Sequence, residues 1–181
     1  MKIIETVLSG VVILEPKIFE DSRGFFTESY NQQVLSELGI EANFVQDNHS
    51  LSVPSGTIRG LHYQLPPHAQ TKLVRVTRGA VYDVAVDIRK QSQTFGRWVG
   101  VILSAENHRQ LLIPQGFAHG FCTLVPNTEV QYKVDAYYSP EDDRGILWSD
   151  PEIGIDWPTS KPTLSDKDQK HPRIGEADLF E

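Results

Sequence analysis

Four side chains able to exchange protons near neutral pH stand at intervals along the chain: His62, Lys72, His119 and Tyr132. Histidine is the side chain whose ordinary pKa suits a general base at this pH. The stretch Arg59–Gln64 reads Arg-Gly-Leu-His-Tyr-Gln, so it combines a cation, a flexible backbone position, a candidate base and an amide. We therefore take this stretch as the centre of a candidate acid–base site.

Gly60 decides which surface these side chains share. Side chains in a strand alternate between its two faces, so Arg59 and His62 would ordinarily point to opposite sides. A glycine inside a strand often marks a β-bulge, which shifts the alternation by one residue. The sequence therefore predicts a bulge at Gly60 that brings Arg59 and His62 to one surface. An edge strand with a partly exposed histidine is the alternative interpretation.

The other candidates also have structural interpretations. In Phe117–Phe121, His119 stands between two phenylalanines on one strand face, so a core histidine with a satisfied ring is the alternative to a functional one. Tyr132 and Tyr138 fall on the apolar face of the segment 128–138. A buried tyrosine needs a hydrogen-bond partner for its hydroxyl, and structural bonding is the usual reason for one. Their position therefore predicts either a shared cavity or ordinary core packing.

The elements that must position these side chains are mostly short strands. Short strands separated by turns are typical of an all-β sandwich or jelly roll. One helix is expected between an N-cap at Asn31 and a stop at Gly39. After Trp157 the composition changes to Ser, Pro, Lys and Asp, which predicts a tail that runs over the surface. The strands expected around the candidate site are 72–77, 80–88, 97–104, 109–114, 117–125 and 128–138.

Length and charge narrow the classes of function. A chain of 181 residues can bury a sizeable core as a single domain, 1–181. Its formal net charge of −7 argues against nonspecific nucleic-acid binding, and no apolar run is long enough to span a membrane. Val7–Leu14 is apolar but follows Glu5 and lacks a cleavage site, so an opening strand is expected rather than a signal peptide. Cys122 is the only cysteine, which predicts a reducing compartment, the cytoplasm.

The segment Ile113–His119 contains the spacing Pro-x-Gly-x-x-His, which resembles the second motif of the cupin superfamily. The first cupin motif supplies a His-x-His pair and a glutamate that hold a metal. Here His62-Tyr-Gln64 and Lys72 would take its place. An amide replaces imidazole poorly, and a lysine cation opposes a divalent metal. We therefore expect a cupin-like barrel that works without metal.

Several segments together resemble one family, the dTDP-4-dehydrorhamnose 3,5-epimerases. They follow one another in order from near the N-terminus to the tail, so the resemblance is more specific than any one motif. The matching segments are Phe25–Tyr30, Phe44–His49, Arg59–His62, Lys72–Arg75, Asp83–Arg89, Ile113–Phe121, Tyr137–Pro140 and Leu164–Asp168.

This resemblance implies an all-β double-stranded β-helix, a jelly roll of the cupin type with one or two short helices. It implies a dimer whose N-terminal strands cross to the partner, and an enzyme without cofactor or metal that acts on a dTDP-4-keto-6-deoxy-hexose. His62 would be the general base, Asp168 the carboxylate paired with it, and Tyr132 the acid on the opposite face. Lys72 would stabilise the enolate. The implied substrate-binding residues are Phe19, Arg23, Glu28, Gln46, Asp47, Asn48, Arg59, His119, Tyr138 and Lys167.

Three other functions stay open at this point. Epimerases that invert only C3 or only C5 of such sugars carry the same residues. A metal-dependent cupin isomerase or oxygenase and a sugar-binding barrel without catalysis are further alternatives, the last opposed by the joint presence of His62, Lys72 and Tyr132. Asp168 would be an ordinary solvated charge unless the tail folds back onto a histidine.

Overall fold

The computed structural model describes all residues, 1–181, and consists almost entirely of antiparallel strands. The helical segments are α1 (Gln32–Glu37) and the single 3₁₀ turn η1 (Ile174–Glu176). The strands are β1 (Lys2–Glu5), β2 (Val12–Glu15), β3 (Ile18–Asp21), β4 (Gly24–Thr27), β5 (Gln46–Ser52), β6 (Ile58–Gln64), β7 (Lys72–Arg78), β8 (Ala80–Asp87), β9 (Trp98–Ser104), β10 (Gln110–Ile113), β11 (Phe117–Thr123), β12 (Thr128–Val134) and β13 (Asp143–Gly145).

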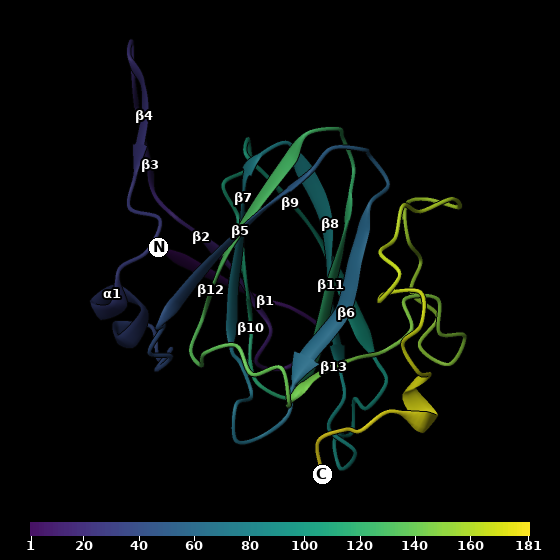
Figure 1. Cartoon of the computed structure of the whole chain (residues 1–181). Helices are drawn as coiled ribbons and strands as arrows, with labels where there is room; N and C mark the ends of the chain where they lie inside the picture. Colours follow the sequence, from purple (N-terminus) through teal and green to yellow (C-terminus); the bar gives the residue numbers. More distant parts are fainter.

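Two sheets face each other and form a jelly-roll barrel (Figure 1). The six-stranded sheet has the order β1-β2-β10-β7-β12-β5, and the five-stranded sheet has the order β13-β6-β11-β8-β9. Apolar side chains from both sheets fill one end of the space between them, among them Val74, Leu111, Phe117 and Phe121. This architecture confirms the all-β jelly roll predicted from the sequence.

The tail runs over the surface, as predicted, and packs on the outer face of the five-stranded sheet through Ile174. Val84 and Val86 of β8 point outward there and are fully buried beneath Ile153 and Ile174. Figure 1 shows this yellow segment alongside the sheet. The sheet is therefore apolar on both faces. Its inward face nevertheless carries the buried Asp83, because strand side chains alternate.

Helix α1 lies against the other sheet, where Leu35 packs on Leu73 and Leu112. The Asn31 side chain accepts hydrogen bonds from the Gln33 and Val34 amides, so the predicted N-cap is confirmed. Gly39 adopts a positive φ of 80° just after the helix, as the predicted stop requires.

The last predicted strand ends four residues early, at Val134 rather than at 138. Side chains replace the strand pairing beyond that point. The Asp135 carboxylate accepts a hydrogen bond from the Thr71 amide at 2.6 Å, and the Gln70 side chain donates to the Ala136 carbonyl at 2.8 Å. Tyr138 therefore lies in a loop rather than on the strand that carries Tyr132.

Strands β3 and β4 pair only with each other and project from the barrel as an isolated hairpin (Figure 1). We call residues 18–27 the arm. Phe19, Phe25 and Phe26 on the arm are 51%, 59% and 69% exposed, so it carries apolar surface that the chain itself does not cover. No helix of the structure has the length and hydropathy needed to cross a membrane.

Candidate active site

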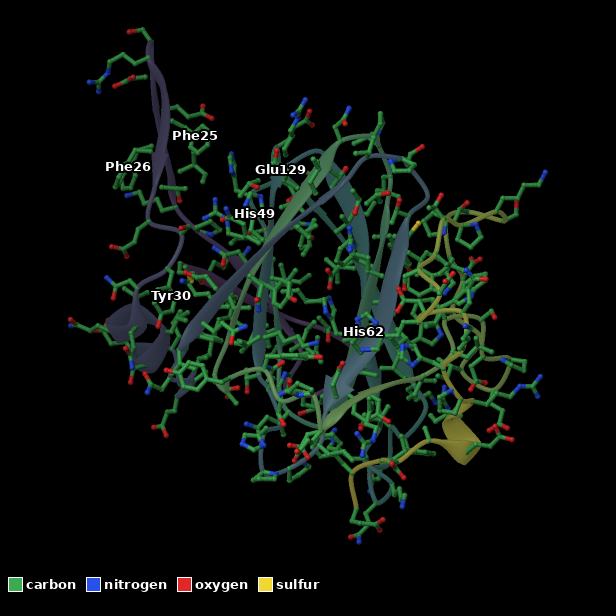
Figure 2. The ribbon with its side chains drawn as sticks, viewed as in Figure 1. Phe25, Phe26, Tyr30, His49, His62 and Glu129 are labelled. Carbon is green, nitrogen blue, oxygen red and sulfur yellow. The ribbon has the colours of Figure 1, made fainter.

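A cavity of about 550 Å³ opens between the two sheets at the end that the apolar core leaves unfilled. This volume is in the range of small-ligand sites. Both sheets and the tail contribute polar side chains to it, and Figure 2 shows His62 pointing inward between the sheets. Ten of the predicted site residues line the cavity: Gln46, Asn48, Arg59, His62, Lys72, His119, Tyr132, Tyr138, Lys167 and Asp168.

The bulge predicted at Gly60 is present and places two of these side chains on one wall. His62 pairs with His119 and Arg59 pairs with Phe121, so three steps along β6 match two along β11. Gly60 has a φ of 130°, and a Cβ there would lie 2.6 Å from the Gly120 Cα. Only glycine allows this close approach of two strands. Arg59 and His62 therefore both line the cavity, as the sequence predicted.

His62 is paired with a carboxylate from the tail. Thr163 pairs with Thr57 beside the start of β6, and the turn that follows points the Asp168 carboxylate at the imidazole. The distance from His62 Nε2 to Asp168 Oδ1 is 2.6 Å. The Asp168 amide in turn donates to the Ser165 hydroxyl oxygen at 3.1 Å. Asp168 is 3% exposed, so it is a buried partner rather than a solvated charge.

The charge states of this pair follow from its surroundings. Burial alone would raise the pKa of the Asp168 carboxyl, but His171 and His62 beside it lower the pKa well below its ordinary value. Burial lowers the pKa of His62, and Asp168 offsets part of that effect. The imidazole is therefore neutral near pH 7. Because the ionised carboxylate can only accept, the His62 Nε2 carries the proton and Nδ1 keeps a free lone pair.

Lys72 extends into the cavity from β7 and is 7% exposed. Its ammonium donates to the His62 carbonyl at 3.2 Å and forms no ion pair with a carboxylate. Burial lowers its pKa to about 8, although the negative charges of Asp143 and Asp83 partly support the cation. The cavity thus holds a cation that is largely free to bind an anionic oxygen.

Tyr132 lies on β12 in the opposite wall from His62. Its side chain is partly buried against the apolar core, and burial raises the pKa of its hydroxyl. The hydroxyl forms no hydrogen bond within the chain, although it lines the cavity. The structural role expected of a buried tyrosine would require such a partner. The geometry favours the functional interpretation.

A second histidine–aspartate pair lies deeper in the cavity. His119 Nε2 is 2.9 Å from Asp83 Oδ1, and the two side chains come from the adjacent strands β11 and β8. Asp83 is fully buried, and its other oxygen, Oδ2, has no hydrogen-bond partner. Both interpretations of His119 hold, because its Nε2 is hydrogen bonded to Asp83 and its side chain also lines the cavity.

The open end of the cavity is polar. The Arg59 guanidinium is held by Ser52 and by the Leu51 carbonyl, both at 3.1 Å, and keeps further donors free. Lys167 forms an ion pair with Asp143 at the same rim. Fixed cations of this kind suit an anionic ligand such as a diphosphate.

Four of the predicted substrate-binding residues lie outside the cavity. Phe19 and Arg23 are on the arm, where Arg23 pairs with Asp21 and not with any cavity residue. Glu28 is exposed in the loop after the arm. Asp47 faces the outside of β5 and pairs with Lys133 at 2.7 Å, because strand alternation turns it away from Gln46 and Asn48.

Sequence reasoning missed two carboxylates at the site. Asp143 lines the cavity, pairs with Lys167 and accepts a hydrogen bond from the Tyr138 hydroxyl at 3.2 Å. Asp83 fixes the ring of His119. The signal for Asp83 was its place beside Val81 and Ala85 on one face of the strand 80–88. For Asp143 the sequence offers no signal, because β13 is three residues long and lies in a charged loop.

The residues at the cupin metal position do not fit a metal. Both ends of the Gln64 amide are used by the backbone: its nitrogen donates to the His68 and Tyr137 carbonyls, and its oxygen accepts from the Ser139 amide. The buried Lys72 ammonium occupies the same region and would repel a divalent ion.

Comparison with known proteins identifies the family. The family model described as dTDP-4-dehydrorhamnose 3,5-epimerase matches residues 5–176. The chain belongs to this epimerase family. A curated family member from Shigella flexneri is 58% identical to this chain over 181 residues, which cover 99% of each protein. The match confirms the resemblance drawn from the sequence and makes the chain an isomerase that acts on a sugar derivative.

Solved structures of epimerases support the fold as well. A dTDP-4-dehydrorhamnose 3,5-epimerase from Bacillus anthracis, solved with TDP and PPi bound, is 61% identical and has a TM-score of 0.93 over 95% of this chain and 98% of its own. A dTDP-6-deoxy-D-glucose-3,5-epimerase from Legionella pneumophila, in complex with dTDP-4-keto-L-rhamnose, is 49% identical, with a TM-score of 0.95 over 99% and 97%. This chain therefore has the same barrel fold as the solved members of its family.

Proposed function

We propose that His62, Asp168, Lys72 and Tyr132 convert dTDP-4-dehydro-6-deoxy-D-glucose to dTDP-4-dehydro-L-rhamnose by inverting C3 and C5. The observation that carries this assignment is the position of His62 and Tyr132 on opposite sheets of one cavity. A sugar ring between the sheets then meets a base on one face and an acid on the other.

The substrate explains why one set of residues serves two carbons. C3 and C5 both flank the C4 ketone, so the same carbonyl acidifies both protons. His62 Nδ1 removes a proton from one face, and the Asp168 carboxylate stabilises the imidazolium that forms. Charge develops on the C4 oxygen, where the Lys72 ammonium stabilises the enolate. Tyr132 then returns a proton to the opposite face, which inverts the carbon.

The rim of the cavity would hold the nucleotide. Arg59 and Lys167 supply positive charge for the diphosphate, and Gln46 and Asn48 supply amides on the neighbouring strand β5. Tyr138 is 57% exposed at the mouth, where its ring can stack on the base. His119, held by Asp83, would contact the sugar deeper in the cavity.

The arm supports a dimer in which each subunit contributes to the cavity of the other. Phe19 and Arg23 are too far from their own cavity to line it, yet they combine an exposed ring with an exposed cation. In Figure 2 the arm, with Phe25 and Phe26 labelled, points away from His62. Crossing to a second copy would cover these apolar rings and would bring Phe19, Arg23 and Glu28 to bound nucleotide.

The single buried cysteine suits a cytoplasmic enzyme.

Incubation of the protein with the 4-keto-sugar nucleotide in heavy water tests the function. We expect deuterium at both C3 and C5 and a product with the L configuration. Exchange and inversion at one carbon alone would make the protein a single-position epimerase. Binding of the nucleotide sugar with no exchange would leave only a sugar-binding barrel.

A further inference from the structure

A third histidine approaches the catalytic carboxylate from the side away from the cavity. His171 Nε2 is 3.6 Å from Asp168 Oδ1, the same oxygen that bonds His62, and the rings of His171 and His62 meet edge to face at 5.6 Å between centroids. The His171 side chain is only 9% exposed because its ring packs against Gly145.

The His171 Nε2 atom is buried and has no hydrogen-bond partner. A buried nitrogen left unsatisfied destabilises the folded chain, so a ligand that pairs with it is favoured. His62, Asp168 and His171 each offer one ligand atom, and the three atoms lie within 4.8 Å of one another. Two imidazoles and a carboxylate form the ligand set of many three-ligand zinc sites, in which water takes the fourth position.

We propose that His62, Asp168 and His171 form a zinc-binding site that inhibits the enzyme, on the basis of the proposed role of His62 as the base. This site shares His62 with the cupin metal position, but its other two ligands, Asp168 and His171, come from the tail. Zinc–ligand bonds of about 2.0–2.2 Å in tetrahedral geometry separate ligand atoms by about 3.3 Å. The 3.6 Å separation of His171 and Asp168 is already close to that value, and the 2.6 Å pair has to open slightly.

Zinc at this site would disable the base through its tautomer. The His62 Nε2 now carries a proton that it donates to Asp168. When zinc takes the Nε2 lone pair, the proton moves through water to Nδ1, and no net proton is lost. Nδ1 is the nitrogen that removes protons from the sugar, so a protonated Nδ1 cannot act. Because the ion lies behind the imidazole rather than in the sugar position, kcat falls more than KM rises.

Equilibrium dialysis of the metal-free full-length protein against Zn²⁺ tests the site directly. We expect one bound ion per chain, and for Co²⁺ the intense visible absorption of a tetrahedral complex. His171→Phe keeps an aromatic ring but removes the ligand nitrogen, and should weaken binding at least about 10–100-fold. His171→Gln is the second variant if the larger ring disturbs folding. Equal zinc affinity in the wild type and in a folded His171 variant would overturn the proposal.

A matched control is the surface pair His68–Asp142, which has a 2.6 Å contact but no third ligand. His68→Ala should leave the zinc stoichiometry at one. Loss of the bound ion in His68→Ala would place the site elsewhere.

Kinetics supply the second readout. Zinc should lower the wild-type kcat by roughly 10²-fold or more, the contribution of a general base. The folded His171→Phe protein should stay active at the same zinc concentration. Mg²⁺ binds diphosphate but prefers oxygen ligands, so it should not inhibit. Zinc inhibition that only raises KM would show that zinc acts on the diphosphate of the substrate and would reject the site. A protein that binds zinc through His171 but shows no epimerase activity would refute the proposed function alone.

Discussion

The two sheets that enclose the cavity carry different chemistry. The five-stranded sheet presents His62 and His119, and each imidazole is hydrogen bonded to an aspartate. The six-stranded sheet presents Lys72 and Tyr132, and neither side chain contacts a carboxylate. A carboxylate fixes the tautomer of an imidazole and favours its protonated form, whereas an unpaired donor stays available to substrate.

Under the proposed mechanism, this difference assigns a direction to proton movement. The five-stranded sheet would accept a proton, and the six-stranded sheet would donate one and stabilise negative charge. Inversion at carbon requires this separation, because a single group on one face would return the proton to the side from which it came. Changes on either wall should therefore have separable effects, and the following experiments measure them from the largest effect to the smallest.

Replacement of the base should abolish chemistry at both carbons. For His62→Ala we expect deuterium exchange at C3 and at C5 to fall together by roughly 10²–10⁴-fold or more. His49→Ala is a suitable control, since His49 pairs with Glu129 on the outer surface (Figure 2). Full exchange in His62→Ala would require a base on the other wall.

Loss of the acid should separate exchange from inversion. Tyr132→Phe leaves His62 and Lys72 in place, so deprotonation continues and the enolate is reprotonated from the face of His62. We expect solvent deuterium in recovered substrate and a loss of L-sugar product of roughly 10²–10⁴-fold. Product analysis by NMR distinguishes the two. A folded variant that forms the L-sugar at the wild-type rate would make Tyr132 a structural residue.

The loss of the Lys72 proton should produce the basic limb in the pH profile of kcat/KM. Burial lowers its pKa to about 8, so above that pH the ammonium loses its proton and the enolate loses its cation. Therefore kcat/KM should fall as the pH rises through about 8. Lys72→Met should lower the rate by roughly 10²–10³-fold at neutral pH and remove this limb. A limb that persists unchanged in Lys72→Met belongs to another group.

Asp168→Asn should have a smaller effect than removal of the base, since the imidazole remains. The hydrogen bond between two charged groups contributes about 1.5–3 kcal/mol to the imidazolium state, which corresponds to a loss of about 10–150-fold. The loss should appear in kcat more than in KM. Without the carboxylate the pKa of His62 falls further, so the acidic limb should move to lower pH. A limb that does not move would separate Asp168 from His62 during turnover.

Removal of metal ions should not change the activity of the enzyme. Treatment with a chelator is expected to leave full activity, because the amide of Gln64 and the cation of Lys72 occupy the cupin metal position. Activity lost to the chelator and restored by zinc or iron would contradict the metal-free mechanism.

Local patterns in the sequence predict the strands, the helix and the bulge. Alternation along 80–88 and 128–138, the Asn31 cap and Gly60 each concern residues within a few positions of one another, where backbone geometry follows from residue type. The match of segments to a known family extends these predictions to ten of the cavity residues.

Contacts between distant segments could not be predicted from pattern alone. Asp168 is 106 residues from His62, and a polar tail gives no sign of the turn that brings the two together. The buried face that holds the tail, with Ile153 and Ile174, depends on a few apolar side chains scattered among polar ones. The position of Asp143 at the cavity likewise depends on contacts between segments that are distant in the sequence. Family resemblance named Asp168, but only the structure shows how it is held.

The bulge at Gly60 divides strand β6 into two halves of opposite phase. Arg59 lines the cavity from an odd position before it, and His62 does so from an even position after it. A one-residue insertion between Arg59 and Gly60 would turn Arg59 away from the cavity while His62 kept its register. One strand thus carries two side chains whose register can change independently, so under the proposed function the binding of the nucleotide by Arg59 can change without moving His62.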